Sequence, residues 1–249
     1  MIKKHRFRIL LLVLFFGILI FAFLSNATLR ILFPGKIRAH KVNTVEKMSE
    51  ASKHFSGLEL DVFFHSDGNY FEVNHPPDSS INLSLANYLI ANSKDKSCSY
   101  WLDFKNLNQY NAQVAAHILD SLLQVCQLNP SHFIVESMLP QFLKTFKEKG
   151  FLTSYYLPTE LYLKSDSELT EQLKQIKLNL NNYNPTYISF DYRDYSLLKK
   201  SFPEQKKISW FTVYGKTNKF TARWILFEMA FDKQLDVLLL PYHAAKGNR

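Results

Sequence analysis

LELDVFF, at residues 58–64, is the stretch that decides the fold of this chain. Its Leu, Val and Phe content is typical of a buried strand, and two carboxylates, Glu59 and Asp61, interrupt it. Strand side chains alternate between faces, so both carboxylates point one way and the aliphatic residues around them point the other. Two neighbouring carboxylates on a buried face lose hydration and repel each other. The pattern therefore predicts a bound divalent cation.

Strands of this kind alternate with helices along most of the chain. Residues 112–126 form the clearest helix, and another is predicted at residues 139–148. A short strand at residues 70–73 returns beside the opening stretch. The eight main strands are predicted at residues 36–40, 58–64, 100–104, 132–136, 152–156, 186–190, 207–213 and 237–240. The alternation predicts an α/β fold, a (β/α)₈ TIM-type barrel, and no GxGxxG or P-loop motif follows any strand.

Polar and aromatic residues gather at the carboxyl ends of these strands, where such barrels place their active sites. Three carboxylates suit an oxygen-preferring cation, Mg²⁺ or alternatively Ca²⁺. Two histidines suit acid–base or nucleophilic work near neutral pH, and a lysine suits a phosphate oxygen. This set predicts phosphodiester cleavage with a metal as Lewis acid. Besides Glu59 and Asp61, the rim residues are His40, Asn43, His75, Asp103, Lys105, Glu136 and Trp210.

Less specific interpretations stay open for the same residues. Glu59 and Asp61 also fit a solvated edge strand, and Asp103 with Lys105 also fits a plain salt bridge across the rim. Trp210 also fits a core position. Cys98 and Cys126 fit either two unrelated thiols or one disulfide.

The N-terminus carries the strongest targeting signal in the chain. Residues 9–29 run without a charge after the basic KKHRFR, and about 20 apolar residues are enough to cross a bilayer. The charge asymmetry predicts a cytoplasmic basic tip followed by a single-pass transmembrane helix, which together form an anchor over residues 1–29. An extracytoplasmic barrel would follow over residues 30–249. The alternative is a signal peptide cleaved after the small-x-small triplet at residues 25–27, which would give a secreted protein.

The net charge of +8 reflects this N-terminus more than the barrel. Four of the 30 Lys and Arg residues precede the apolar run, which leaves 26 against 22 Asp and Glu, a net of +4. No basic patch interleaved with aromatic residues stands out, so we expect no nucleic-acid partner.

Four motifs carry a family resemblance. AHKVN at residues 39–43, LELDV at 58–62, HPP at 75–77 and WLDFKN at 101–106 resemble, in order and spacing, the phospholipase C-like phosphodiesterases. Within that superfamily the chain is similar to the glycerophosphodiester phosphodiesterase, sphingomyelinase D and menorin-like branches. SWFTV at residues 209–213 resembles the family's Trp-Thr-Val strand.

The resemblance implies a function and a role for each motif residue. His40 and His75 would be the catalytic pair. Glu59, Asp61 and Asp103 would hold the metal, and Lys105, Asn43 and Trp210 would bind the substrate, a phospholipid or glycerophosphodiester-type compound.

Two departures separate the chain from the glycerophosphodiesterase pattern. The Glu-Asn-Thr expected after the first histidine is reduced to Asn43-Thr44, and Pro76 follows His75 where Asp is usual. These differences favour a sphingomyelinase D-like or menorin-like variant. The alternative function is a catalytically inactive menorin-like barrel with a binding or structural role.

Overall fold

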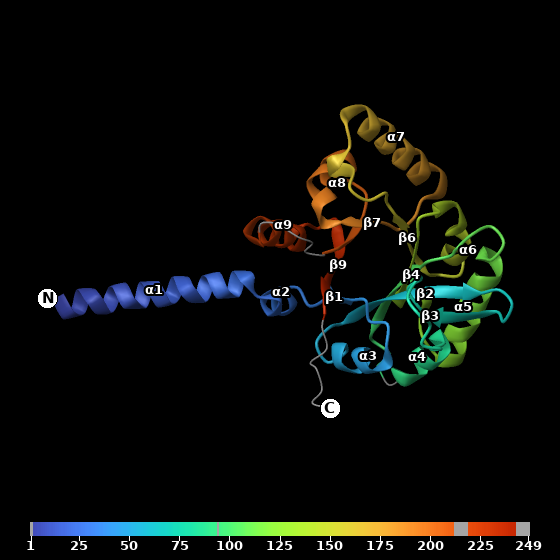
Figure 1. Cartoon of the computed structure of the whole chain (residues 1–249), viewed down its shortest axis with the longest axis horizontal. Coiled ribbons are helices and arrows are strands. Elements are labelled where there is room, and N and C mark those ends of the chain that lie inside the picture. The colour runs from blue at the N-terminus through green and yellow to red at the C-terminus, as the bar shows by residue number, and fades with distance from the viewer. Residues whose placement is uncertain (1, 94, 212–218, 243–249) are drawn as a thin grey trace.

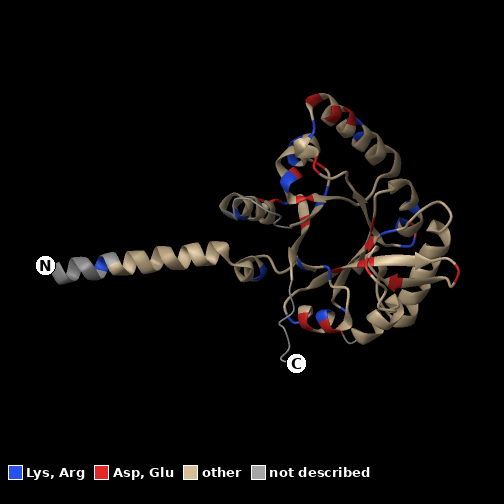
Figure 2. Cartoon of the chain, viewed as in Figure 1, with Lys and Arg blue, Asp and Glu red and all other residues tan. Residues whose placement is uncertain are grey.

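The computed structural model describes residues 2–93, 95–211 and 219–242. Eight parallel strands close into a barrel surrounded by helices, and the ring of strands is seen end-on in Figures 1 and 2. Strand β3 (Tyr70–Val73) lies outside the ring as an antiparallel neighbour of β2. The barrel strands are β1 (Ile37–His40), β2 (Gly57–His65), β4 (Ser99–Phe104), β5 (Phe133–Ser137), β6 (Leu152–Tyr156), β7 (Tyr187–Asp191), β8 (Lys207–Trp210) and β9 (Leu235–Pro241). The predicted TIM-type barrel is confirmed.

Each α-helix of the barrel follows a strand in chain order. They are α3 (Val45–Ala51), α4 (Leu85–Ala91), α5 (Ala112–Cys126), α6 (Lys144–Lys147), α7 (Asp166–Tyr183), α8 (Tyr195–Ser201) and α9 (Lys219–Phe231). Short 3₁₀ turns are η1 (Pro130–His132), η2 (Pro140–Phe142), η3 (Leu161–Leu163) and η4 (Tyr192–Asp194). Two further helices, α1 (Ile2–Leu24) and α2 (Asn26–Leu32), precede the barrel.

Two predicted elements differ from the structure. The helix expected at residues 139–148 is divided into η2 and α6, because Pro140 opens a 3₁₀ turn before the α-helix begins. The strand expected at residues 207–213 is described as far as Trp210. Residues 212 and 213 lie outside the described part of the chain.

Two apolar clusters follow from strand alternation. Leu58, Leu60 and Val62 of β2 face outward into the main core beneath the helices, as predicted. A smaller cluster fills the barrel and consists of Trp101, Ile134, Tyr187, Ile208, Val237 and Leu239. This inner layer forms the floor beneath the polar residues at the carboxyl end of the barrel.

Helix α1 projects away from the barrel and carries no charged residue beyond Arg8 (Figures 1 and 2). Among the described residues, no single helix has both the length and the apolar character of a membrane span. Leu10–Leu24 and Asn26–Leu32 meet that standard only as a pair bent by 78°. The predicted N-terminal transmembrane helix is therefore not found as a single helix among the described residues. The first helix ends at Leu24, and Ser25 caps α2 by accepting a hydrogen bond from the Ala27 amide at 3.2 Å.

The two cysteines, Cys98 and Cys126, are both free and buried, so the structure has the unpaired thiols that the sequence left as one of two alternatives.

Candidate active site

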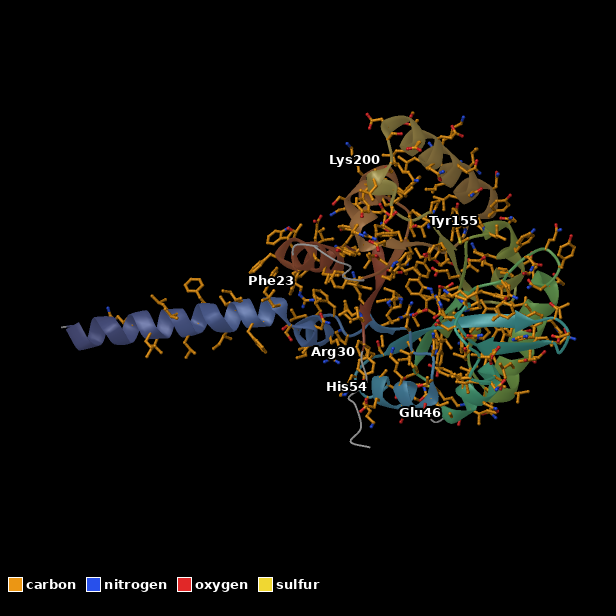
Figure 3. All side chains as sticks on the ribbon, viewed as in Figure 1. Phe23, Arg30, Glu46, His54, Tyr155 and Lys200 are labelled. Atoms are coloured by element: carbon orange, nitrogen blue, oxygen red, sulfur yellow. The ribbon has the colours of Figure 1, made fainter. Side chains whose placement is uncertain are left out.

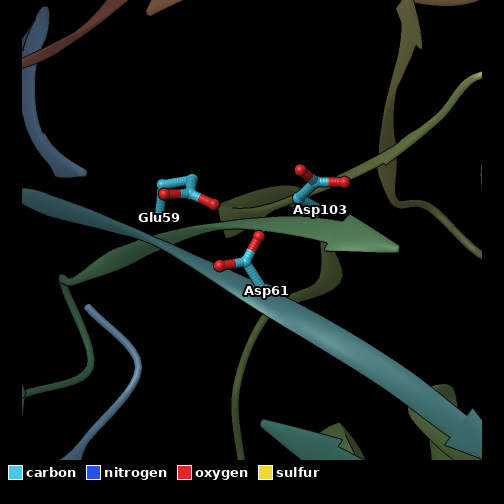
Figure 4. A group of neighbouring side chains, drawn as sticks. All are labelled: Glu59, Asp61 and Asp103. Carbon is cyan, nitrogen blue, oxygen red and sulfur yellow. The ribbon is translucent and has the colours of Figure 1, made fainter. Parts of the chain in front are cut away.

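Three carboxylates form the centre of the site. Glu59 and Asp61 lie two residues apart on β2, and the β2–β4 register places Asp103 directly beside Asp61. One oxygen from each carboxylate lies within 4.8 Å of the others, and the three side chains converge in Figure 4. Such an all-oxygen donor set fits a hard divalent cation, so these residues can bind a metal ion.

Mutual repulsion shapes the electrostatics of this cluster. Burial, reinforced by the charges of Asp61 and Asp103, raises the pKa of Glu59 well above its usual range. Burial also raises the pKa of Asp103, partly opposed by Lys105. The carboxylates are thus held together at an electrostatic cost, which a bound cation would remove.

Lys105 is the one cationic side chain in contact with the cluster among the described residues. Its Nζ lies 2.6 Å from Asp61 Oδ1 and also contacts Asp103 Oδ2. Although burial acts in the opposite direction, the two carboxylates raise the pKa of Lys105 above its usual value. The amine is therefore charged and fixed at the cavity wall, where it can bind an anionic oxygen.

His40 ends β1 beside the carboxylates. Its Nε2 lies 3.6 Å from Glu59 Oε2, and its side chain is largely buried. Burial, together with the nearby Lys41 charge, lowers the pKa of His40 to about 4. The imidazole is therefore neutral at neutral pH and can accept a proton or attack an electrophile.

His75 reaches the same cavity from the loop after β3. The loop is joined to β2 by a hydrogen bond from the Asn74 amide to the Asp61 carbonyl, at 3.1 Å. Nδ1 of His75 lies 3.7 Å from Oδ2 of the exposed Asp78. Both predicted catalytic histidines thus line one cavity: His40 from the end of β1, and His75 from the loop after β3.

The loop after β1 supports the carboxylates from the backbone. The Lys41 amide donates to Glu59 Oε2 at 2.6 Å, with Lys41 in the left-handed conformation at φ 54°. Asn43 donates from Nδ2 to Asp61 Oδ2 at 2.6 Å and accepts from the Asp61 amide at 3.0 Å. Both ends of the Asn43 amide are thus engaged by Asp61. Its predicted contact with substrate stays a prediction.

An aromatic wall closes the opposite side. The Trp210 ring stacks on Tyr156 with centroids 4.8 Å apart and planes 10° apart. Tyr156 was not singled out from the sequence, although it ends a predicted strand two residues beyond Ser154, which pairs with Glu136. The sequence signal for Tyr156 is its place at the carboxyl end of a predicted strand, where such barrels gather their active-site residues.

Glu136 also faces the cavity, next to Asp103 across the β4–β5 pair. It is buried, and its Oε2 has no hydrogen-bond partner among the described residues. Burial, together with the Asp103 charge, raises the pKa of Glu136 well above its usual range. Glu136 is therefore a fourth acidic group beside the cluster, and burial favours its protonated form.

The cavity encloses about 150 Å³. Its wall contains every predicted site residue except Asn43, together with Lys41, Trp101, Glu136, Tyr156 and Leu239. The arrangement combines a carboxylate cluster that suits a cation, a fixed ammonium group and two imidazoles around one small space. These are the components for binding and cleaving a phosphate ester.

No protein-family model and no curated protein sequence matches the chain. Its fold, however, is similar to that of several solved barrels. A glycerophosphodiester phosphodiesterase from Parabacteroides distasonis superposes with a TM-score of 0.59 at 17% identity, over 82% of this chain and 91% of that one. An Oleispira antarctica phosphodiesterase, solved with the product sn-glycerol-3-phosphate, gives a TM-score of 0.53 at 12% identity, over 84% and 94% of the two chains.

An N-(5′-phosphoribosyl)anthranilate isomerase from Pyrococcus furiosus gives a TM-score of 0.50 at 12% identity, over 85% and 90% of the chains. At such low identity these likenesses establish the fold alone, and activity has to be argued from the site. The comparisons thus confirm the predicted barrel, a fold that this chain shares with the glycerophosphodiester phosphodiesterases.

Proposed function

We propose that this protein is a metal-dependent phosphoric diester hydrolase. The observation that carries the proposal is the convergence of Glu59, Asp61 and Asp103 within 4.8 Å, with Lys105 on two of them. A structural ion pair needs one carboxylate per lysine, whereas three carboxylates against one lysine leave room for a divalent cation. The likeness to glycerophosphodiester phosphodiesterase barrels supports the same class.

Each residue has a role in this proposal. The three carboxylates hold Mg²⁺ or Ca²⁺, which supplies Lewis-acid stabilisation of the phosphate charge when bound. Lys105 binds a second phosphate oxygen. Neutral His40 assists or makes the new bond to phosphorus, and His75 gives a proton to the departing alcohol oxygen. Attack by water yields a phosphomonoester and an alcohol, whereas attack by a neighbouring substrate hydroxyl yields a cyclic phosphate.

The shape and chemistry of the site support a substrate class. A diester leaves an alcohol on one side of phosphorus, and the Tyr156–Trp210 wall offers an apolar surface to that group. A glycerophosphodiester or phospholipid fits this arrangement. The product named for the Oleispira antarctica phosphodiesterase, sn-glycerol-3-phosphate, supports a glycerol-based substrate.

We further propose that the N-terminal segment anchors the barrel to a membrane, with the barrel extracytoplasmic. Apolar side chains of α1 are exposed from Leu10 to Phe21, and α9 adds Trp224 and Phe231, each 69% exposed. Phe23, labelled in Figure 3 at the barrel end of α1, stacks on Phe227 of α9 with centroids 5.1 Å apart.

Arg223 of α9 holds the junction of α1 and α2 against α9. Its Nε donates to the Phe23 carbonyl at 3.0 Å, and its Nη1 donates to Asn26 Oδ1 at 2.7 Å. The exposed apolar side chains of α1 and α9 are thus joined at a fixed junction. Retention in the membrane fraction after an alkaline carbonate wash supports the anchor, and a mature N-terminus at Thr28 in the soluble fraction supports the cleaved alternative.

The activity test uses the full chain in detergent on glycerophosphodiesters, lysophospholipids, sphingomyelin and a chromogenic diester, with Mg²⁺, Ca²⁺ or EDTA. We expect metal-dependent turnover that His40→Ala lowers by about 10²–10⁴-fold. The matched control is His54→Ala, because His54 is exposed in the turn just after α3 and does not line the cavity (Figure 3). Metal binding without turnover of any diester would favour the inactive binding barrel.

A further inference from the structure

A second cavity adjoins the carboxylate site. It encloses about 420 Å³ and shares Asp103, Lys105 and Tyr156 with the first cavity. The rest of its wall is formed by Phe104, Leu107, Ser137, Met138 and Leu139. A largely apolar space thus begins at the residues that would hold the metal and the phosphate.

This cavity lies between two loops at the carboxyl end of the barrel. Met138 and Leu139, after β5, are 64% and 39% exposed although both are apolar. Single exposed apolar residues need no explanation, but two consecutive ones beside a buried Leu107 form a continuous surface.

The loops on both sides are fixed by hydrogen bonds. Asn106, next to Leu107, accepts from the Phe64 amide and donates to the Phe64 carbonyl, both at 2.9 Å. On the other side the Leu139 amide donates to Ser137 Oγ at 3.1 Å. The apolar surface is therefore preorganised, which lowers the entropic cost of binding a ligand there.

We propose that this second cavity, the chain groove, binds the alkyl or acyl chain of a single-chain phosphodiester whose phosphate occupies the carboxylate site. The inference rests on the proposed function and specifies its substrate as a lysophospholipid-type compound. Continuity through Lys105 and Tyr156 lets one molecule place its phosphate on the lysine and its chain on Leu107, Met138 and Leu139. A soluble glycerophosphodiester with a short polar alcohol would leave this surface in water.

The test compares glycerophosphocholine with lysophosphatidylcholines of six, eight and ten acyl carbons, all below their micelle-forming concentrations, on the full chain. Each methylene that enters the groove strengthens binding about fourfold. We expect kcat/KM to rise with chain length in wild type. Met138→Ser and Leu139→Ser should flatten that rise and leave turnover of glycerophosphocholine unchanged.

Val125→Ser is the matched control, because Val125 is an apolar residue of α5, 79% exposed and outside both cavities. The chain groove would be overturned if kcat/KM did not rise with acyl-chain length in wild type, or if both groove variants kept that rise. In either case, turnover of glycerophosphocholine would still support the diesterase.

Calorimetric titration of the eight-carbon compound distinguishes failure of the chain groove from failure of the proposed diesterase. Binding with a negative heat-capacity change that Met138→Ser weakens, without turnover, supports the groove and argues against the enzyme. Absence of binding overturns the groove.

Discussion

Replacing Glu59 by Gln separates two properties of the carboxylate cluster: the repulsion between its charges, and its ability to bind a metal ion. Glu59 is buried, with oxygens of Asp61 and Asp103 within 4.8 Å. At an effective dielectric constant of about 20, each pair of unit charges at that separation repels by about 3.5 kcal/mol. Lys105 offsets part of this repulsion. Burial, reinforced by the charges of Asp61 and Asp103, raises the pKa of Glu59 well above its usual range. Gln keeps the oxygen that accepts from the Lys41 amide.

We therefore expect Glu59→Gln to be more stable than wild type in EDTA, by about 1–3 kcal/mol. For a chain of this size that difference raises the melting temperature by about 2–12 °C. Saturating Mg²⁺ or Ca²⁺ should act in the opposite direction, because the cation stabilises wild type and not the variant. At 100 times the Kd a ligand adds about 2.7 kcal/mol, or about 5–11 °C, to wild type and nothing to the variant.

The assay is thermal unfolding followed by circular dichroism, in EDTA and in each divalent cation, with NaCl at matched ionic strength. Glu72→Gln is the control, because Glu72 is also a buried strand carboxylate but has partners. Although burial acts against it, hydrogen bonds from Ser80 and His65 lower the pKa of Glu72. We expect this control to be destabilised and to keep the metal response. A Glu59→Gln protein less stable than wild type in EDTA, or one that still responds to the cation, would refute the reasoning.

Three further predictions concern the support of the site and the barrel. Lys105→Met should lower kcat/KM for a diester by about 10²–10³-fold, measured in saturating metal, because it removes a fixed positive charge from the phosphate site; a loss below tenfold would contradict the phosphate role. Asn43→Ala should weaken divalent-cation affinity by about 10–100-fold in calorimetric titration, since Asn43 orients Asp61 through two hydrogen bonds; unchanged affinity would mean that Asp61 needs no such support. Burial raises the pKa of Asp194 to about 6, so the native protein binds a proton at Asp194 more tightly than the unfolded chain does. The stability that this proton confers is therefore lost as pH rises from about 4 through 6. Urea unfolding across that range should show a steeper loss for wild type than for Asp194→Asn, and parallel curves would exclude the assignment.

The periodicity of the chain determined most of the fold. Alternation along residues 58–64 placed Glu59 and Asp61 on one face and the aliphatic residues on the other, because side-chain direction in a strand is a local property. The predicted helix at residues 112–126 is α5, with the same bounds, and Thr44 caps α3 as its type favours. Such features depend on neighbours in sequence, so they can be read without knowing what packs against them.

The tertiary structure decided what depends on register and closure. The neighbours Asp61, Asp103 and Glu136 come from three strands, and only the hydrogen-bonding register puts them side by side. The stack of Tyr156 on Trp210 joins β6 to β8, and the chain groove joins the loops after β4 and β5. The break at Ser25 that divides the apolar N-terminus could not be predicted from composition either. Hydropathy measures how apolar a segment is and not where it bends. The sequence by itself therefore determined the chemistry available at the rim, and the closed barrel determined which groups can act on one phosphate, because distances between strands are set by packing rather than by order along the chain.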